Sequence, residues 1–160
     1  MPYKVFISHN VAQGDYILVT NIANLLWQDG MEVYIPEWYP RYTEAVNKHT
    51  ASQIQASDIV IAIVTSATSR STAMSQEIGF ALAQGKSVIA LVEEGINTEG
   101  FLDQVPKVDL NRWDFEKSAE SVLQYLKQYR KDTNAGKALG GLILLGLGLW
   151  VLSQLGRSED

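Results

Sequence analysis

Metal-binding residues are scarce in this chain of 160 residues, which has no cysteine and only two histidines, His9 and His49. Disulfide bonds and thiolate metal sites are therefore excluded, and two histidines forty positions apart do not supply a histidine-rich zinc site. The sequence also lacks a P-loop, a GxGxxG fingerprint and the motifs of a nucleophilic triad. We expect no metal ion and no bound cofactor.

Basic residues are outnumbered by acidic ones, and the formal net charge is −5. Residues 1–132 alone hold eleven Lys and Arg against sixteen Asp and Glu, which again gives −5. An acidic domain binds a phosphate backbone poorly, so nucleic acid is not an expected partner. With 46% hydrophobic and 19% charged residues, the chain has enough apolar side chains to bury a core, and its length suits one domain.

One long uncharged segment near the C-terminus departs from this average composition. Residues 138–152 (ALGGLILLGLGLWVL) carry no charged or polar side chain, and the uncharged stretch continues to residue 155. A helix over these eighteen residues spans ~27 Å, close to the ~30 Å hydrocarbon core of a bilayer. We therefore predict a transmembrane helix at 138–155. A buried C-terminal helix is the alternative, although such a helix normally keeps a polar stripe.

Basic residues flank this predicted helix unequally. Lys127, Arg130, Lys131 and Lys137 precede it, whereas only Arg157 follows it. The positive-inside rule then places the preceding residues in the cytoplasm, as the main part of a single-pass, C-terminally anchored membrane protein. The expected division of the chain is a domain at 1–132, a linker at 133–137, the transmembrane helix at 138–155 and a short tail at 156–160.

Within residues 1–132, short apolar runs alternate with stretches of helical periodicity, which is the pattern of a parallel α/β sheet. The expected strands are 3–8, 31–35, 58–65, 87–92 and 108–110. The expected helices run from an N-cap at Asp15 to a glycine stop at Gly30, and over 44–56, 71–84 and 116–129. The run at 58–65 (DIVIAIVT) is the most apolar, so we expect it at the centre of the sheet.

Ligands of open parallel sheets bind at the carboxyl ends of the strands, where three loops are expected, at 9–14, 36–43 and 66–72. The second of these loops carries Trp38 and Tyr39 between two prolines. Aromatic side chains in a loop are costly to leave in water, which indicates contact with a ligand or a partner. Local packing of the loop is the alternative.

Glu77 follows the most apolar run, about two turns into the helix expected at 71–84. From there a carboxylate can point into the crevice, where it could stabilise a cationic, oxocarbenium-like sugar carbon or accept hydrogen bonds from ribose hydroxyls. Spacing alone favours a solvent-exposed helix glutamate instead. His9 is near the same crevice but fits an ordinary loop residue equally well, and His49 is expected on a helix surface.

Four motifs occur along the chain in the order VFISH, DGMEVYIPEW, ASDIVIAIVTSATSRS and MSQEIGFALAQGKSVIALVEEG. Together they resemble a Toll/interleukin-1 receptor (TIR) domain of the bacterial type, over residues 3–129. The resemblance implies a flavodoxin-like parallel sheet of order 2-1-3-4-5, in agreement with the expected elements. It also implies cleavage of the nicotinamide–ribose bond of NAD, by hydrolysis or cyclisation, in signalling or anti-phage defence.

The resemblance also implies roles for single residues. The family's catalytic glutamate falls on Glu77. Ser8, His9 and Asn10 match the loop that lines the nucleotide pocket, and Trp38 matches an aromatic residue of the loop that gates it. The expected substrate-binding residues are therefore Ser8, His9, Asn10, Trp38, Tyr39 and Ser66.

Two positions depart from the family pattern. Ala73 stands where many members have a tryptophan four residues before the glutamate, and Asn10 stands where they have a basic residue. Fewer contacts to the rings and phosphates of the substrate are expected, which allows for low, altered or absent activity.

Two other functions stay open. The stretch EIGFALAQGKSVI also resembles nucleoside deoxyribosyltransferases, in which a glutamate at this place attacks the anomeric carbon. TIR domains also act as non-catalytic scaffolds that assemble with other TIR domains. The preferred hypothesis is a cytoplasmic, membrane-anchored TIR domain that consumes NAD as its substrate through Glu77 and is switched on by self-association at the membrane.

Overall fold

The fold was analysed in a computed structural model that describes residues 2–9, 15–36, 48–66 and 71–136. Three of the expected substrate-binding residues, Asn10, Trp38 and Tyr39, lie outside the described residues, as does the predicted transmembrane helix at 138–155. In the part of the chain that is described, no helix has the length and apolar character needed to cross a bilayer.

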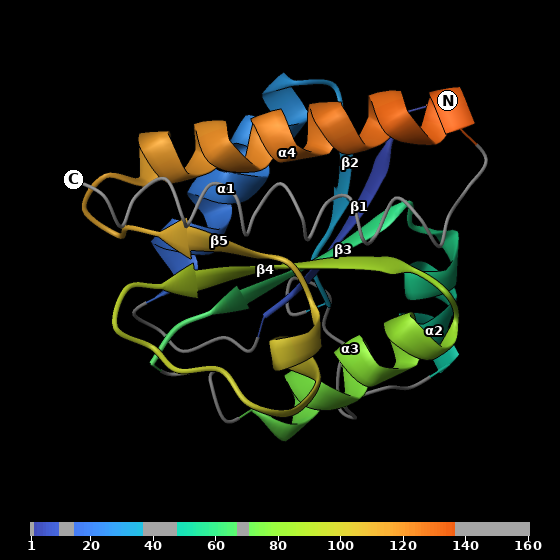
Figure 1. The fold of residues 1–160 in the computed structure, drawn as a ribbon, viewed down its shortest axis with the longest axis horizontal. Coiled ribbons are helices and arrows are strands. Elements are labelled where there is room, and N and C mark those ends of the chain that lie inside the picture. The colour runs from blue at the N-terminus through green and yellow to red at the C-terminus, as the bar shows by residue number, and fades with distance from the viewer. Residues whose placement is uncertain (1, 10–14, 37–47, 67–70, 137–160) are drawn as a thin grey trace.

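Five parallel strands form one sheet in the order β2-β1-β3-β4-β5 (Figure 1). The strands are β1 (Lys4–Ser8), β2 (Glu32–Tyr34), β3 (Ile59–Val64), β4 (Ser87–Glu93) and β5 (Lys107–Leu110). All five were expected from the sequence, and the order 2-1-3-4-5 confirms the flavodoxin-like α/β fold.

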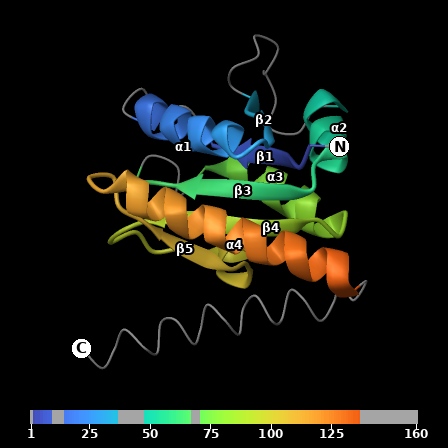
Figure 2. The same ribbon diagram turned by 90° about the horizontal axis from the view of Figure 1, so that it is seen from above.

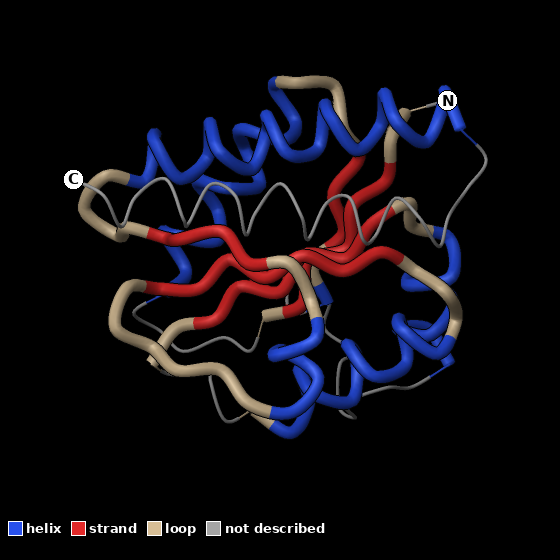
Figure 3. Tube along the Cα trace, viewed as in Figure 1, coloured by secondary structure: helices blue, strands red, loops and turns tan. Residues whose placement is uncertain are grey.

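Helices cover both faces of this sheet, so the molecule has three layers (Figures 1 and 3). The helices are α1 (Tyr16–Gln28), α2 (Lys48–Ala56), α3 (Thr72–Ala83) and α4 (Phe115–Gly136). Buried residues of α1 pack with Val122 and Leu126 of α4 in one core cluster, and Ile54 of α2 packs with α3 in the other. Figure 2 shows α1 and α4 crossing the same face of the sheet.

Strand β3 lies at the centre of the sheet and is buried along its whole length, as its apolar sequence predicts. Successive side chains of a strand point to opposite faces. Ile59, Ile61 and Ile63 accordingly belong to the cluster with α1 and α4, whereas Val60, Ala62 and Val64 belong to the cluster with α2 and α3. The same alternation decides which polar side chains share a face at the ends of the strands.

The helices differ from expectation at two places. The region before β5, where no helix was expected, contains the 3-10 helix η3 (Gly100–Gln104). Helix α4 was expected to end at residue 129, but it continues to Gly136 and includes the first residues of the expected linker. No glycine or proline interrupts the chain between those two points, so nothing local stops the helix earlier. Helix α2 is described from Lys48 onward.

Helix α1 ends as expected. Its last residue is Gln28, and Gly30 follows with a φ of 81°, a left-handed conformation that glycine adopts without strain. The backbone N–H groups of Gly30 and Met31 donate to the carbonyls of Trp27 and Leu26. These bonds close the last turn of the helix before β2 begins.

Candidate functional site

Glu77 occupies a core position of α3. The buried residues of this helix are Met74, Glu77, Ile78 and Ala81, which follow the spacing of a single helix face. Glu77 is only 2% exposed, so the carboxylate belongs to the face that packs on the sheet. The solvent-exposed position that spacing alone favoured is therefore wrong.

Residue Ser71 determines where α3 begins. It is the N-cap of the helix, and its side-chain oxygen accepts a hydrogen bond from the backbone N–H of Met74 at 3.2 Å. The helix therefore starts a short way beyond the carboxyl end of β3. This start places Glu77, six residues further along the chain, in the second turn.

The hydroxyl of Ser8 donates a short hydrogen bond of 2.5 Å to Oε2 of Glu77. Ser8 is the last residue of β1 and is fully buried. Phe6, two residues earlier, packs in the cluster formed with α2 and α3, so the period of the strand directs Ser8 to the same face. The structure thus brings together two residues that the TIR resemblance assigned to one pocket.

Burying a carboxylate is costly unless hydrogen bonds replace the water that it loses. The Ser8 hydroxyl supplies one such bond, and a hydrogen bond to an ionised acceptor is stronger than a neutral one. The pair therefore fixes the position of a carboxyl group near the carboxyl edge of the sheet. An ionised carboxylate at this place can stabilise a cation that develops on a sugar carbon, or it can accept hydrogen bonds from sugar hydroxyls.

His9 lies next to Ser8 in the chain but beside Asp15 in space. Its Nε2 is 3.6 Å from Oδ2 of Asp15, and the residue is 3% exposed. The same carboxylate oxygen accepts a hydrogen bond of 2.6 Å from the hydroxyl of Thr65. Among the described residues, neither ring nitrogen of His9 has a hydrogen-bond partner.

Asp15 stands at the N-cap position of α1, yet its side chain makes no capping hydrogen bond. The expected capping role is wrong, because the carboxylate is engaged by tertiary partners instead. Nη2 of Arg112 lies 2.6 Å from its Oδ1, and Nε of Arg112 lies 2.9 Å from Oε1 of Glu93. One guanidinium thus joins the start of α1, the end of β4 and the segment after β5.

Burial and the neighbouring polar and charged groups shift the pKa of Asp15 in opposite directions. Burial raises the pKa of its carboxyl, but the hydrogen bonds from Thr65 and Arg112 and the Arg112 charge outweigh burial, so the pKa lies below its usual value. Burial lowers the pKa of the His9 imidazole more than Asp15 raises it. At neutral pH the carboxylate is therefore ionised and the imidazole beside it is neutral.

The network of Asp15, Arg112 and Glu93 was not predicted from the sequence. The positions of the charged residues could have indicated it, since Glu93 ends β4 and Arg112 follows β5 at the carboxyl edge where α1 also begins. Opposite charges at one edge of a parallel sheet are candidates for pairing. In the described ranges, no group of three or more His, Asp or Glu side chains is placed to hold a metal ion.

The remaining expected site residues are only partly described. Ser66 is exposed just beyond the carboxyl end of β3. His49 lies on the exposed side of α2, as expected. Its ring stands edge-on to that of Tyr34, with 5.7 Å between the two ring centroids. Of the expected site, the structure therefore joins Ser8 to Glu77, places His9 with Asp15 and leaves Ser66 in solvent.

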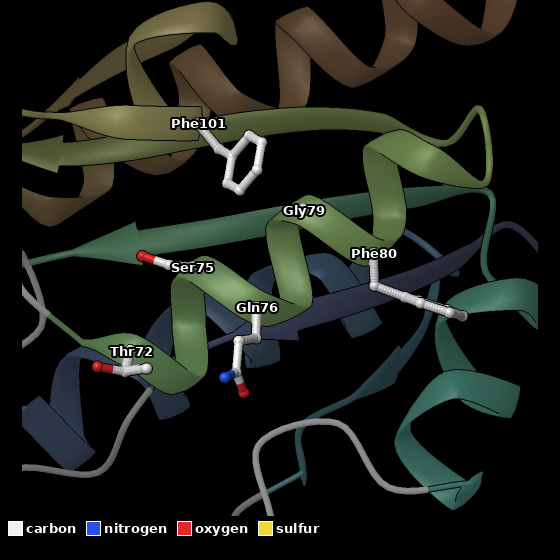
Figure 4. Close-up of a pocket in the computed structure, with 6 residues that line it drawn as sticks. All are labelled: Thr72, Ser75, Gln76, Gly79, Phe80 and Phe101. Carbon is white, nitrogen blue, oxygen red and sulfur yellow. The ribbon is translucent and has the colours of Figure 1, made fainter.

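A shallow groove of about 430 Å³ lies on the outer side of α3 (Figure 4). Its lining residues are Thr72, Ser75, Gln76, Gly79, Phe80 and Phe101. The Phe101 ring points toward the helix near Gly79 (Figure 4). None of these side chains is charged, and Glu77, on the opposite side of the helix, does not line the groove. The groove is thus separate from the Ser8–Glu77 pair.

Solved structures with this fold include three that are distant in sequence. The 2-deoxyribosyltransferase of Bacillus psychrosaccharolyticus is 16% identical, with a TM-score of 0.57 over 69% of this chain and 88% of that chain. The CMP N-glycosidase BcmB of Clostridium botulinum is 23% identical, with a TM-score of 0.54 over 79% of this chain and 99% of that chain. A prokaryotic SEFIR domain is 19% identical, with a TM-score of 0.55 over 75% and 95%. At these identities the likeness shows the fold alone.

The sequence itself matches a family model. No curated protein is significantly similar to the chain. The model described as TIR domain, however, matches residues 5–123, which include most of β1 with Ser8, α3 with Glu77 and the start of α4. The matched range is most of the chain, and the sheet order agrees with the fold that the TIR resemblance implied. The chain therefore belongs to the TIR domain family.

Proposed function

We propose that this TIR domain cleaves the nicotinamide–ribose bond of NAD and that Glu77 is its catalytic residue. The observation that carries the proposal is the burial of a carboxylate in the core stripe of α3, with the Ser8 hydroxyl bonded to it. A glutamate in that stripe costs stability relative to an apolar residue. Such a cost is typical of a residue kept for function.

In the proposed reaction, the bond between ribose C1 and the nicotinamide ring nitrogen breaks. The bonding electron pair stays with that nitrogen, so the pyridinium becomes neutral nicotinamide, while positive charge develops on the ribose. The Glu77 carboxylate stabilises this charge. A water molecule then forms the new bond to C1 and loses a proton, which gives ADP-ribose, or a nucleophilic atom of the same nucleotide does so, which gives a cyclic product.

Support for the chemistry also comes from other proteins with the same fold. Two of them are named a CMP N-glycosidase and a 2-deoxyribosyltransferase, so this arrangement of strands and helices is compatible with reactions at a sugar–base bond. Their low identity leaves the substrate of this chain to be decided by its own residues. We propose that NAD is contacted by His9, Asn10, Trp38, Tyr39 and Ser66.

A deoxyribosyltransferase-like reaction also uses a glutamate at ribose C1, so it is a second candidate. It differs from the first in substrate, because a deoxyribonucleoside would be consumed and NAD would not. Supplying both substrates to the same protein separates the two reactions. Consumption of the nucleoside alone would replace the NAD assignment.

A non-catalytic scaffold is the third candidate. It is favoured by apolar side chains left in solvent, above all Trp113, which is 92% exposed, and Ile17, which is 73% exposed. A scaffold keeps its self-association when Glu77 is replaced, whereas an enzyme loses its product. Measuring both properties on one variant therefore distinguishes the two.

We further propose that residues 138–155 anchor the chain in the membrane with the TIR domain in the cytoplasm, and that self-association there raises activity. Anchoring increases local concentration, so weak contacts between copies suffice. Carbonate washing of membranes provides the test. An anchored chain stays in the pellet until detergent is added, and its release by carbonate alone would contradict the anchor.

Product analysis tests the NAD reaction. The full chain is incubated with NAD, and nicotinamide and the ADP-ribose species are resolved by chromatography, beside Glu77→Ala and Glu77→Gln. A matched control is Glu120→Gln, because Glu120 is an exposed carboxylate on α4. We expect nicotinamide from the unmodified chain and the control only. Unchanged NAD cleavage by Glu77→Ala would refute the catalytic assignment.

A further inference from the structure

We propose that Ser8 is a positioning residue, which orients the Glu77 carboxylate and keeps it ionised, and that it does not contact the substrate. This inference rests on the proposed function, since it assigns Ser8 a role in the reaction at Glu77. It also replaces the role that the family resemblance implied for Ser8, which was direct contact with the nucleotide.

The proton inventory of the pair supports this assignment. A serine hydroxyl has a single proton to donate. The Ser8 hydroxyl donates that proton to Oε2 of Glu77 at 2.5 Å, so it has none left for a phosphate or carbonyl oxygen of a substrate. Ser8 is also fully buried, with Glu77 as its side-chain acceptor. The hydroxyl proton is thus committed to the carboxylate.

The backbone around the pair is held on both sides. Strand β1 is hydrogen-bonded between β2 and β3, and Ser8 is paired with Ala62 of β3. Helix α3 is held against the sheet by the buried side chains of Met74 and Ile78. Two groups carried by rigid elements keep their separation without further ordering when a substrate arrives. The carboxylate is therefore oriented before binding.

The hydrogen bond has a chemical effect beyond orientation. Donation to an ionised oxygen stabilises the carboxylate against protonation, which opposes the effect of burial. Only the ionised form can stabilise a developing cation. Loss of the Ser8 hydroxyl should then lower the rate of bond cleavage and move the acid limb of the rate profile to higher pH. Substrate binding should change little.

The test measures kcat, KM and the pH profile of NAD cleavage by the full chain with Ser8→Ala and Ser8→Thr. We expect Ser8→Ala to lower kcat about 10- to 100-fold, the effect of one lost hydrogen bond to a charged group, with the acid limb moved to higher pH. KM should stay within about twofold of the original value because the bond lost is not to substrate. Ser8→Thr, which keeps the hydroxyl, should recover much of the rate.

Ser57→Ala is the matched control. Ser57 is also a buried serine, but its hydroxyl donates to the carbonyl of Ile54 at 2.7 Å, at the amino end of β3. It should lose some thermal stability without any shift of the pH profile. A raised KM with unchanged kcat in Ser8→Ala would show that Ser8 binds substrate, and a kcat loss without movement of the acid limb would show a merely structural role. Either result overturns the proposal.

A second readout is independent of NAD cleavage. The Glu77 carboxyl carbon, labelled with ¹³C, can be titrated by NMR in the original chain and in Ser8→Ala. The midpoint of the Glu77 titration should move to higher pH in Ser8→Ala, and an unchanged midpoint would contradict the positioning role. If the original chain leaves NAD intact while the midpoint moves, the proposed function fails and the Ser8–Glu77 relationship stands.

Discussion

Nη2 of Arg112 lies 2.6 Å from Oδ1 of Asp15, although the two residues are 97 positions apart in the chain. The guanidinium also reaches both carboxylate oxygens of Glu93, at 2.9 and 3.1 Å. The segment after β5 is thereby tied to the start of α1 and to the end of β4. The Asp15 carboxylate also accepts a hydrogen bond from the Thr65 hydroxyl and lies beside His9, which directly follows Ser8.

Replacing Arg112 by Ala should destabilise the domain. Asp15 has a side chain only 4% exposed and would lose its charged partner, so we expect a loss of about 2–3 kcal/mol in the free energy of unfolding. The stability of Arg112→Lys should lie between that of the original chain and that of Arg112→Ala, since an ammonium keeps the charge but cannot reproduce the forked contact with both carboxylates. Urea unfolding measures the change.

Lys127→Ala is the comparison for Arg112→Ala. The Lys127 ammonium pairs with Asp29 at 3.4 Å, but its side chain is 61% exposed. A surface pair of this kind contributes about 0–1 kcal/mol. Equal losses in the two variants would show that the buried Arg112 network stabilises no more than a surface pair.

Acid should destabilise the domain through His9 before it does so through Asp15. Burial depresses the pKa of His9 below its ordinary 6.5, so the unfolded chain takes up a proton at a higher pH than the folded chain does. Stability is then fully present above about pH 6.5 and falls as the pH drops below it. The depressed pKa of Asp15 acts in the same direction at lower pH, below its ordinary value of 3.8.

Urea midpoints between pH 5 and 8 test this dependence, and His9→Gln should flatten the curve over that range. His49→Gln is the matched control, because His49 is exposed on α2. A curve that stays equally steep in His9→Gln would locate the proton uptake elsewhere.

Glu77→Gln should separate stability from activity. The amide keeps the shape of the side chain and an oxygen that can accept the Ser8 hydrogen bond, while the cost of burying a charge disappears. We expect the free energy of unfolding to stay equal or to rise by up to about 2 kcal/mol, with NAD cleavage lost. A marked fall in thermal stability would mean that the charge itself supports the fold.

Gly79 and Phe101 should be coupled energetically. A Cβ added at Gly79 would stand 2.9 Å from Cε2 of Phe101, a close contact with the end of a side chain that is 47% exposed (Figure 4). Alanine is favoured over glycine inside a helix by about 1 kcal/mol. Part of this gain should be lost in moving the ring, so Gly79→Ala should stabilise Phe101→Ala more than it stabilises the original chain.

A double-mutant cycle measured by urea unfolding gives the coupling of Gly79 and Phe101 directly. We expect an interaction energy of about 0.5 kcal/mol or more. Additive effects of the two substitutions would show that the ring moves aside at no cost.

The sequence by itself determined the architecture. Apolar runs such as β3 and the amphipathic spacing of the helices depend on neighbours a few positions apart, and they predicted every strand and α-helix in the described part of the chain. The TIR resemblance, and not the order of polar and apolar residues, placed Ser8 and Glu77 at one pocket. The spacing that favoured an exposed Glu77 did not take into account that Met74, Ile78 and Ala81 share its helix face.

Only the tertiary structure decided what the charged and hydroxyl groups do. Asp15 looked like a helix cap because that role needs only local sequence, but its partners Thr65 and Arg112 lie 50 and 97 positions away. Glu77 is bonded to Ser8 across 69 positions. A side chain with several possible acceptors or donors is assigned by which strand ends converge in space, and that convergence follows from the order of the strands in the sheet.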